Sequence, residues 1–306
     1  MIRPFFLMLL LSVAVFATAQ EKTKIIIDAD TGNEVDDLYA VVRALIEPSW
    51  EVTGINATQW QVSHWATEKT MEESFRLNNV LLAYLGMNDK VVSNRGAEAR
   101  LFDWGNMSQP SAASNYIIEE AEKCKEGKIN VVALGALTNV ASAILDKPEI
   151  TTKICLYWLG TTYDFENNVM GNTDFNNVMD IQAIHIILNS DVEFHVIPVS
   201  VASQMIYTWE ETEKHLEGLK EPAGFLLHRW YDHFDGGRKD RILWDLALIQ
   251  AIIFPEMAEE VEIQTSKEKG DRKIWMYKDI DADVMKEEFF KSISAFLAEY
   301  KGAARE

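Results

Sequence analysis

The sequence predicts an α/β fold of Rossmann-like class, with an open, mostly parallel sheet and helices on both of its faces. Two observations carry this prediction. Short runs of β-branched and aromatic residues alternate with longer amphipathic runs along the chain, which is the order of a doubly wound domain. The first strand candidate, Ile25–Ile27, is apolar without alternation, as expected for a strand covered on both faces. No repeat or linker interrupts the pattern, so a single domain is expected.

The first half of the chain supplies strands and helices in turn. A helix is expected directly after the first strand, because Leu38, Val41, Val42 and Leu45 fall at i, i+3, i+4 and i+7 and share one face. The later elements follow the same reasoning. Strands are expected at 51–57, 90–93 and 130–134, and helices up to about residue 85, at 112–125 and after residue 139.

The second half of the chain continues the alternation and then becomes helical. Strands are expected at 154–159, 192–200, 261–265 and 273–277, helices within 209–234 and at 242–251 and 285–300, and a polar loop at 160–177. Asp245 stands alone in the otherwise apolar helix 242–251. A buried carboxylate is costly unless it is paired, hydrogen-bonded or bound to a metal, so Asp245 is a candidate site residue.

Five acidic side chains follow the first strand within ten positions: Asp28, Asp30, Glu34, Asp36 and Asp37. In open α/β sheets, ligands bind at the carboxyl ends of the strands. Like charges so close together repel one another unless a cation neutralises them, and hard oxygen ligands suit Ca²⁺ or Mg²⁺. The alternative is a solvated acidic turn in which Asp36 caps the following helix.

The N-terminal residues indicate where the protein is located, and its overall charge limits which partners it can have. Residues 1–19 contain the positively charged Arg3, then an apolar stretch, and then small residues at a possible cleavage site, Ala17–Ala19. This order predicts a signal peptide. The protein is therefore expected to be exported (periplasmic or secreted), with its domain at 20–306. The net charge of −19 argues against nucleic acid or an anionic membrane as partner. The two cysteines, Cys124 and Cys155, are interpreted as buried free thiols, although an oxidising compartment would allow them to pair.

Four blocks, taken in order, resemble the inosine–uridine-preferring nucleoside hydrolase family. The family opens with D-x-D-x-G-x-D-D, here with two extra residues in the loop. Its G-P-L-T-N, N-x5-E-F-N and His-Asp blocks also have counterparts in this sequence. In these counterparts alanine replaces the proline, aspartate replaces the glutamate and tryptophan replaces the histidine. The matching residues are Asp28–Gly32 with Asp36–Asp37, Gly135–Asn139, Asn168 with Asp174–Asn176, and Trp244–Asp245.

The resemblance implies hydrolysis of the N-glycosidic bond of a ribonucleoside with a calcium ion. It implies that the metal is held by Asp30, Asp37, Asp245 and the carbonyl of Thr138, with Asp30 also acting as the general base. The residues implied to bind the substrate are Asp36, Asn168, Asp174, Asn176 and Trp244. The implied partner is a small nucleoside or ribosyl compound. Members are commonly dimers or tetramers, so the resemblance is compatible with a homo-oligomer.

Trp244 replaces the histidine that is linked to departure of the base in many members of the family. Either the leaving group is unusual, or His228 or His233 protonates it, while Trp60, Trp65, Trp230 or Trp244 could stack on the base.

Two other functions stay open: hydrolysis of another ribosyl or glycosyl compound, and metal-dependent binding of ribose without turnover. A haloacid-dehalogenase-like phosphatase also begins with an apolar run and D-x-D, but Gly32 stands where that family has threonine or valine. His195 is interpreted as a satisfied interior or edge residue rather than a ligand.

Overall fold

The computed structural model describes residues 22–104 and 106–300, so the predicted signal peptide at 1–19 lies outside the described residues. An eight-stranded sheet forms the centre, in the order β11-β12-β8-β5-β4-β1-β2-β3. All neighbouring pairs are parallel except β11 and β12. The predicted open, mostly parallel sheet in a single domain is confirmed.

The strands of the main sheet alternate with helices along most of the chain. The strands are β1 Thr23–Ala29, β2 Trp50–Ala57, β3 Val92–Asn94, β4 Ile129–Ala133, β5 Ile154–Leu159, β8 Glu193–Ile197, β11 Ala258–Gln264 and β12 Lys273–Ile280. Two small antiparallel pairs lie outside this sheet. These are β6 Tyr163–Asp164 with β7 Val169–Met170, and β9 Ile206–Thr208 with β10 Asp240–Ile242.

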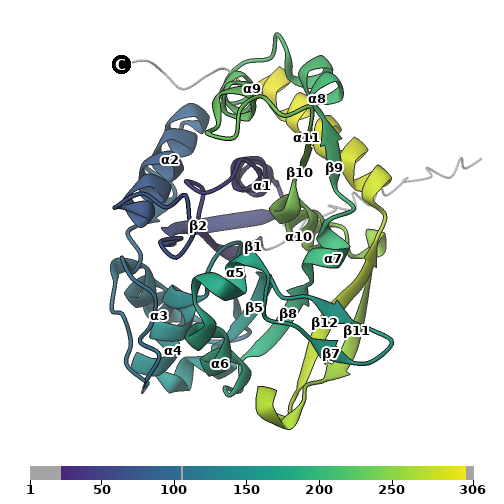
Figure 1. Cartoon of the computed structure of the whole chain (residues 1–306). Helices are drawn as coiled ribbons and strands as arrows, with labels where there is room; N and C mark the ends of the chain where they lie inside the picture. The colour runs from purple at the N-terminus through teal and green to yellow at the C-terminus, as the bar shows by residue number, and fades with distance from the viewer. Residues whose placement is uncertain (1–21, 105, 301–306) are drawn as a thin grey trace, which may run out of the picture.

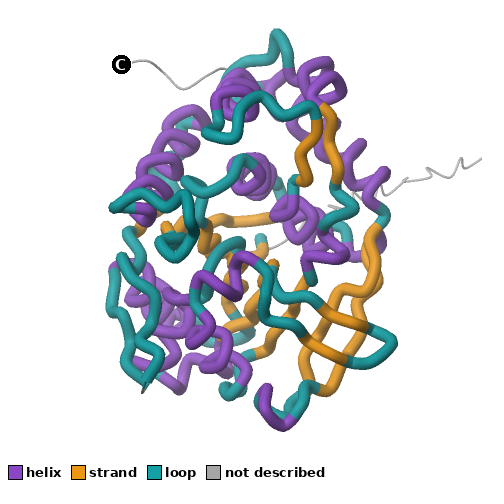
Figure 2. Tube along the Cα trace, in the orientation of Figure 1, coloured by secondary structure: helices purple, strands orange, loops and turns teal. Residues whose placement is uncertain are grey.

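Helices cover both faces of the sheet (Figure 1). The helices α3 Ala112–Lys123, α4 Thr138–Asp146 and α6 Ile181–Leu188 contribute to one hydrophobic core. The other core contains residues of α1 Asp36–Leu45, α2 Thr70–Leu85, α7 Val199–Ala202, α8 Trp209–Leu216, α9 Ala223–Asp232, α10 Trp244–Ile253 and α11 Ala282–Glu299. Figure 2 shows the strands lying between these two groups of helices. The short helix α5 Phe175–Met179 and the 3₁₀ turns Pro148–Lys153, Pro255–Met257 and Lys267–Lys269 complete the described elements.

Strand β1 is buried on both faces, as its sequence predicts. Ile25 and Ile27 belong to one hydrophobic core and Ile26 to the other, because successive side chains of a strand point to opposite faces. The chain runs from β1 outward to β2 and β3, and then returns to place β4 on the opposite side of β1. The reversal between β1 and β4 is a topological switch point, where open α/β sheets bind their ligands.

Two regions contain more structure than the sequence predicts. The expected loop at 160–177 contains the β6–β7 hairpin and the start of α5, and β10 precedes α10 in a stretch where no strand is expected. Two- and three-residue strands are too short to show alternation in the sequence. None of the helices within residues 22–104 and 106–300 has the length and the apolar composition of a membrane span.

Candidate active site

A pocket of about 260 Å³ opens at the switch point, at the carboxyl ends of the central strands. Strand β4 contributes Leu134, just beyond its end, and β5 contributes its last residue, Leu159. The other lining residues come from the loop after β1 and from α1, α5, α7 and α10. They are Asp30, Asn33, Glu34, Asp36, Asp37, Asp174, Phe175, Asn176, Val199, Trp244 and Asp245.

Four aspartates of this pocket are almost completely buried. Asp30, Asp36, Asp37 and Asp245 each expose at most 4% of their surface. A carboxylate oxygen from each of Asp36, Asp37 and Asp245 lies within 4.8 Å of the other two. The alternative of a solvated acidic turn is therefore wrong, and Asp36 does not cap its own helix: its carboxylate accepts a bond from the Asp245 N–H at the start of α10 (3.3 Å), whereas Val35 occupies the N-cap of α1.

The buried carboxylates make one another harder to ionise. Burial raises the pKa of Asp30, Asp37 and Asp245 well above the usual aspartate range, and repulsion from neighbouring carboxylates raises each further. Glu34 lies in the same pocket, and its burial, together with repulsion from Asp36, raises its pKa to about 7. A cation in this pocket would reverse these shifts, because an opposite charge within a few ångströms favours the ionised form.

The donor set fits a hard divalent cation. One side-chain oxygen of each of Asp30, Asp37 and Asp245 is buried without a hydrogen-bond partner. Buried polar atoms normally find a partner, and three unpartnered carboxylate oxygens facing one pocket are best explained as ligand positions. Ca²⁺ takes six to eight oxygen ligands from carboxylates, carbonyls and water, so these aspartates would supply part of its shell.

Gly135 allows the loop after β4 to approach these acids. A Cβ atom at this position would lie 2.6 Å from Asp30 Oδ1 and 2.6 Å from Thr58 Oγ1, so only glycine leaves room for the Asp30 carboxylate. The group that this loop approaches is therefore the Asp30 side chain.

The predicted Thr138 carbonyl is not at the pocket. Thr138 is the first residue of α4, and its carbonyl accepts a bond from Ser142 Oγ (2.7 Å) inside that helix. Its hydroxyl donates to Asp180 (2.7 Å). Leu134, four residues earlier, lines the pocket instead. The prediction of Thr138 as a ligand is therefore wrong in this structure, because a carbonyl in the first helical turn points along the helix and not toward the strand end.

Asp174 and Asn176 lie at the pocket as predicted. The Asp174 side chain caps α5 by accepting from the Asn177 N–H, and its Oδ2 is buried without a partner. The Asn176 amide donates to the carbonyls of Leu134 (2.7 Å) and Leu159 (2.9 Å), which ties two strand ends together. Since both amide hydrogens are used, Asn176 can offer a ligand only its carbonyl oxygen as an acceptor.

Asn168 does not join them. It is an exposed residue of the β6–β7 turn with a positive φ of 55°, and its side chain accepts a long bond from the Tyr163 hydroxyl (3.4 Å). The prediction that Asn168 lies beside the substrate is wrong in this structure. The spacing to Asp174 fits the family pattern, but Asn168 lies in the exposed turn between β6 and β7 and is not a lining residue of the pocket.

Of the aromatic candidates, only Trp244 lines the pocket. Trp230 is fully buried, and Trp60 is a core residue beside Ala136 and Met179. Trp65 stacks on Phe175, which lines the pocket, with ring centroids 5.5 Å apart. The pocket therefore has one wall made of Phe175 backed by Trp65, and a second flat side chain in Trp244.

Neither histidine proposed as a proton donor is a lining residue of the pocket. The His228 side chain is 67% exposed and pairs with Asp232. His233 is buried and uses both ring nitrogens, one toward Asp235 (2.9 Å) and one toward the carbonyl of Asn33 (2.9 Å). His233 thus holds the loop after β1 in place, and the hypothesis that either residue protonates the leaving group is not supported by their positions.

The two-residue insertion brings two residues into the pocket that the sequence comparison did not assign. Asn33 accepts a bond from the Trp65 indole (3.0 Å), and together with the contact from His233 this anchors the inserted loop. Asn33 and Glu34 both line the pocket. The run of acids made Glu34 visible as part of the cluster, and Phe175 lies within the matched block Asp174–Asn176, although no role was assigned to it. Nothing in the pattern marked Asn33 or Leu134.

The raised pKa values predict how metal-free protein responds to pH. Burial raises the pKa of Asp28 to about 7, and Asp30, Asp37 and Asp245 are shifted in the same direction. Above about pH 4 the unfolded chain has released these protons and the folded chain retains them, so the free energy of unfolding falls as the pH rises toward 7. We expect the melting temperature of metal-free protein to fall between pH 5 and pH 7, and a saturating divalent cation to flatten the part of that slope that comes from Asp30, Asp37 and Asp245. If the melting temperature depends on pH in the same way with and without the cation, the assignment of these three aspartates to a cation site would be contradicted.

Comparisons with known proteins point to one family. The family model described as inosine-uridine preferring nucleoside hydrolase matches residues 25–287. A protein described as probable uridine nucleosidase 2, from Arabidopsis thaliana, is 27% identical over 279 residues, which cover 80% of this chain and 83% of that protein. The pyrimidine-specific ribonucleoside hydrolase RihB of Escherichia coli is 25% identical over 223 residues, covering 68% and 69%. The solved structure of a purine-preferring ribonucleoside hydrolase from Gardnerella vaginalis matches with a TM-score of 0.66 and 21% identity, over 90% of this chain and 99% of the other.

Proposed function

Because this chain belongs to the inosine-uridine preferring nucleoside hydrolase family and is an N-ribohydrolase, we propose that it hydrolyses ribonucleosides to free base and ribose in a calcium-dependent reaction. One observation carries the calcium part of the proposal. Four buried aspartates of the pocket have an unpartnered oxygen. One of them, Asp174, precedes α5. The other three, Asp30, Asp37 and Asp245, also repel one another and so form the candidate cation site. Such a group is unfavourable without a cation and suits an all-oxygen coordination shell.

The residues that would hold Ca²⁺ are Asp30, Asp37 and Asp245. A main-chain oxygen would come from Leu134, which lines the pocket, and not from the predicted Thr138. The Leu134 carbonyl accepts one bond from the Asn176 amide (2.7 Å), so its second lone pair would serve the ion. When bound, the ion supplies positive charge that orients ribose hydroxyls and lowers the pKa of a nearby water molecule.

Asp30 is the general base in this proposal. It lies at the end of β1, immediately beside Gly135, with one carboxylate oxygen free of protein partners. A carboxylate held in this way can accept the proton of the water that attacks C1′ of the sugar. The surrounding carboxylates would stabilise the positive charge that develops on the ribose ring as the glycosidic bond breaks.

The ribose hydroxyls would be held by acceptors from two elements. Asp36 begins α1, and Asp174 and Asn176 belong to the start of α5. The free Oδ2 of Asp174 and the carbonyl oxygen of Asn176 both accept hydrogen bonds, which selects for donating hydroxyl groups. A site that hydrogen-bonds a hydroxyl strongly rejects an analogue that lacks it, because its buried polar groups are then left unpaired.

Trp244 should set the preference for the base. An indole at this position offers a flat apolar surface and cannot protonate a departing base. We expect Trp244→His to change the ratio of kcat/KM between purine and pyrimidine nucleosides by about tenfold or more, because a positioned acid contributes about 10²–10⁴-fold when it aids bond cleavage. The measurement is release of free base and ribose from a panel of nucleosides in phosphate-free buffer.

The matched control is Trp209→His, a partly buried tryptophan on α8 that packs on Trp230 and is not a lining residue of the pocket. It should keep the wild-type ratio. An unchanged ratio in Trp244→His would show that Trp244 does not face the base. Base release by the wild type only when phosphate is present would contradict hydrolysis.

A further inference from the structure

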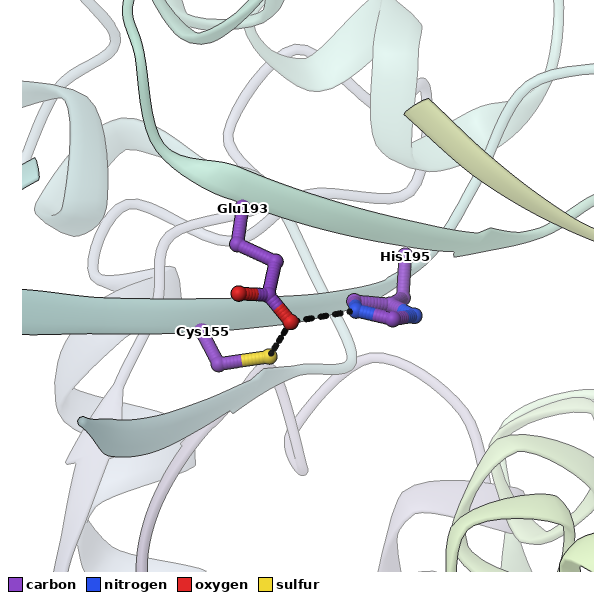
Figure 3. Close-up of side chains that lie close together, drawn as sticks. All are labelled: Cys155, Glu193 and His195. Atoms are coloured by element: carbon purple, nitrogen blue, oxygen red, sulfur yellow. Dashed lines mark hydrogen bonds and ion pairs between the residues drawn. The ribbon is translucent and has the colours of Figure 1, made fainter. Parts of the chain in front are cut away.

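A second cluster of potential metal ligands lies at the opposite end of the sheet from the acidic pocket. Cys155 is the second residue of β5, Glu193 is the first residue of β8, and His195 lies in the middle of β8. The acidic pocket, in contrast, is lined by Leu159 at the other end of β5. Figure 3 shows the Glu193 carboxylate between the thiol and the imidazole, with all three side chains converging. Neither the reaction nor the family comparison assigns a role to these residues.

The two distances from the Glu193 oxygen to the other ligand atoms match a tetrahedral metal shell. Glu193 Oε1 lies 3.4 Å from Cys155 Sγ and 3.2 Å from His195 Nε2, and one ligand atom from each residue lies within 4.8 Å of the others. Zinc bonds of about 2.0–2.3 Å at tetrahedral angles place neighbouring ligand atoms about 3.3–3.6 Å apart. The side chains would therefore need to move little to accept an ion.

His195 is held in the orientation that a metal ligand requires. Its other ring nitrogen, Nδ1, lies 2.7 Å from Glu260 Oε1 on β11. A carboxylate that accepts the Nδ1 proton leaves Nε2 free for a metal, and metal-binding histidines usually have such a partner. The imidazole also stacks between Tyr157 (centroids 4.6 Å apart) and Trp275 (5.0 Å), its neighbours on the adjacent strands.

The cluster combines burial with access from solvent. Cys155 and His195 are 5% and 8% exposed, whereas the Glu193 side chain is 33% exposed. The second oxygen of Glu193 is paired with Lys128. An imidazolium between two carboxylates would account for His195 on its own. It would not account for the thiol, which shares the same Glu193 oxygen as the imidazole.

We propose that Cys155, Glu193 and His195 bind one Zn²⁺ ion, with the fourth position open to water. The mixed sulfur, nitrogen and oxygen donor set suits Zn²⁺ and disfavours Ca²⁺, which prefers oxygen ligands alone. Binding releases the thiol proton, and any proton on Nε2, to solvent. The ion would link β5 to β8 directly, and it would link both strands to β11 through Glu260. Its effect is therefore on the stability of the half of the sheet that runs from β5 to β11.

The proposal is tested with the full chain, purified free of transition metals and kept in excess calcium so that the acidic pocket is filled. Co²⁺ serves as the probe, because a thiolate ligand gives a cobalt charge-transfer absorption in the near ultraviolet. We expect one equivalent of Co²⁺ to produce this absorption and Zn²⁺ to displace it. Cys155→Ser should abolish the absorption, and Glu260→Gln should weaken binding by about 10–100-fold.

The chain provides a matched control in its second cysteine, Cys124, which is partly buried at the end of α3 and does not pair with Cys155. The interpretation of both cysteines as free thiols is confirmed, although Cys124 is not fully buried. Cys124→Ser should bind Co²⁺ like the wild type. His195→Gln, monitored for folding by thermal melting, provides a second loss of binding if Cys155→Ser does not fold.

Two results would overturn the proposal: no cobalt–thiolate absorption in the wild type, or equal absorption in Cys155→Ser. Zn²⁺ should also raise the melting temperature of the wild type and not that of His195→Gln. Nucleoside hydrolysis should be unchanged in Cys155→Ser, which separates this site from the catalytic pocket.

Discussion

Asp30→Asn should reduce kcat for every nucleoside substrate by about 10³-fold or more, because it removes the proposed general base, and such groups contribute about 10²–10⁴-fold. Asparagine keeps the size of the side chain and therefore fits beside Gly135, where a Cβ atom would come within 2.6 Å of Asp30 Oδ1. The fold should survive the change, since the substitution removes one of several mutually repelling carboxylates. The measurement is kcat at saturating substrate and at increasing calcium.

The calcium series separates the two roles assigned to Asp30. Asp30→Asn lacks the base whatever the calcium concentration, so its reduced kcat should persist when calcium is saturating. Recovery of near-normal turnover in excess calcium would make Asp30 a metal ligand only and would contradict its assignment as the base. Asp89→Asn, which changes an exposed aspartate outside the pocket, controls for the charge change and should leave kcat unaltered.

Asp245→Asn should change stability in opposite directions with and without calcium. Without calcium, the Asp245 carboxylate is repelled by Asp37, Asp36 and Asp30 in a buried site, so its neutralisation should raise the melting temperature. With calcium at 100 times its Kd, the wild type should gain about 2.7 kcal/mol, or roughly 5–10 °C for a domain of this size. The variant should lose most of that gain.

Thermal melting of both proteins over a calcium titration makes this comparison. A wild type that gains no stability from calcium, or a variant that gains as much as the wild type, would show that Asp245 does not hold the ion. Magnesium provides a further comparison, because Mg²⁺ demands a smaller octahedral shell than Ca²⁺. We expect it to stabilise the wild type less at equal concentration.

The general architecture was predictable because it rests on local patterns of apolar residues. Ile25–Ile27 indicated a strand buried on both faces, and the structure divides these three residues between the two hydrophobic cores. The helix that follows was evident from its apolar stripe, and its first two residues, Asp36 and Asp37, enter the pocket. The β6–β7 hairpin was not predictable, because its strands of two residues each carry no periodic signal.

The site was predictable where side chains carry the chemistry and unpredictable where the backbone path decides it. Seven of the predicted site residues, all with distinctive side chains, line one pocket: Asp30, Asp36, Asp37, Asp174, Asn176, Trp244 and Asp245. The prediction of Thr138 was wrong because the direction of a carbonyl depends on where β4 ends and α4 begins. Leu134, and not Thr138, directly follows the end of β4. The prediction for Asn168 was wrong because this residue lies in the exposed turn of the β6–β7 hairpin, which residue spacing cannot reveal.

The central claim is that calcium held by the buried aspartates is required for nucleoside hydrolysis. The most direct measurement is ribose release, by a reducing-sugar assay on purified residues 20–306, from a panel of nucleosides before and after calcium chelation and again after calcium is restored. We predict ribose release that disappears with the chelator and returns with added calcium. Ribose release that continues unchanged in the calcium-free protein would contradict the claim, as would the absence of release from any nucleoside while calcium remains bound.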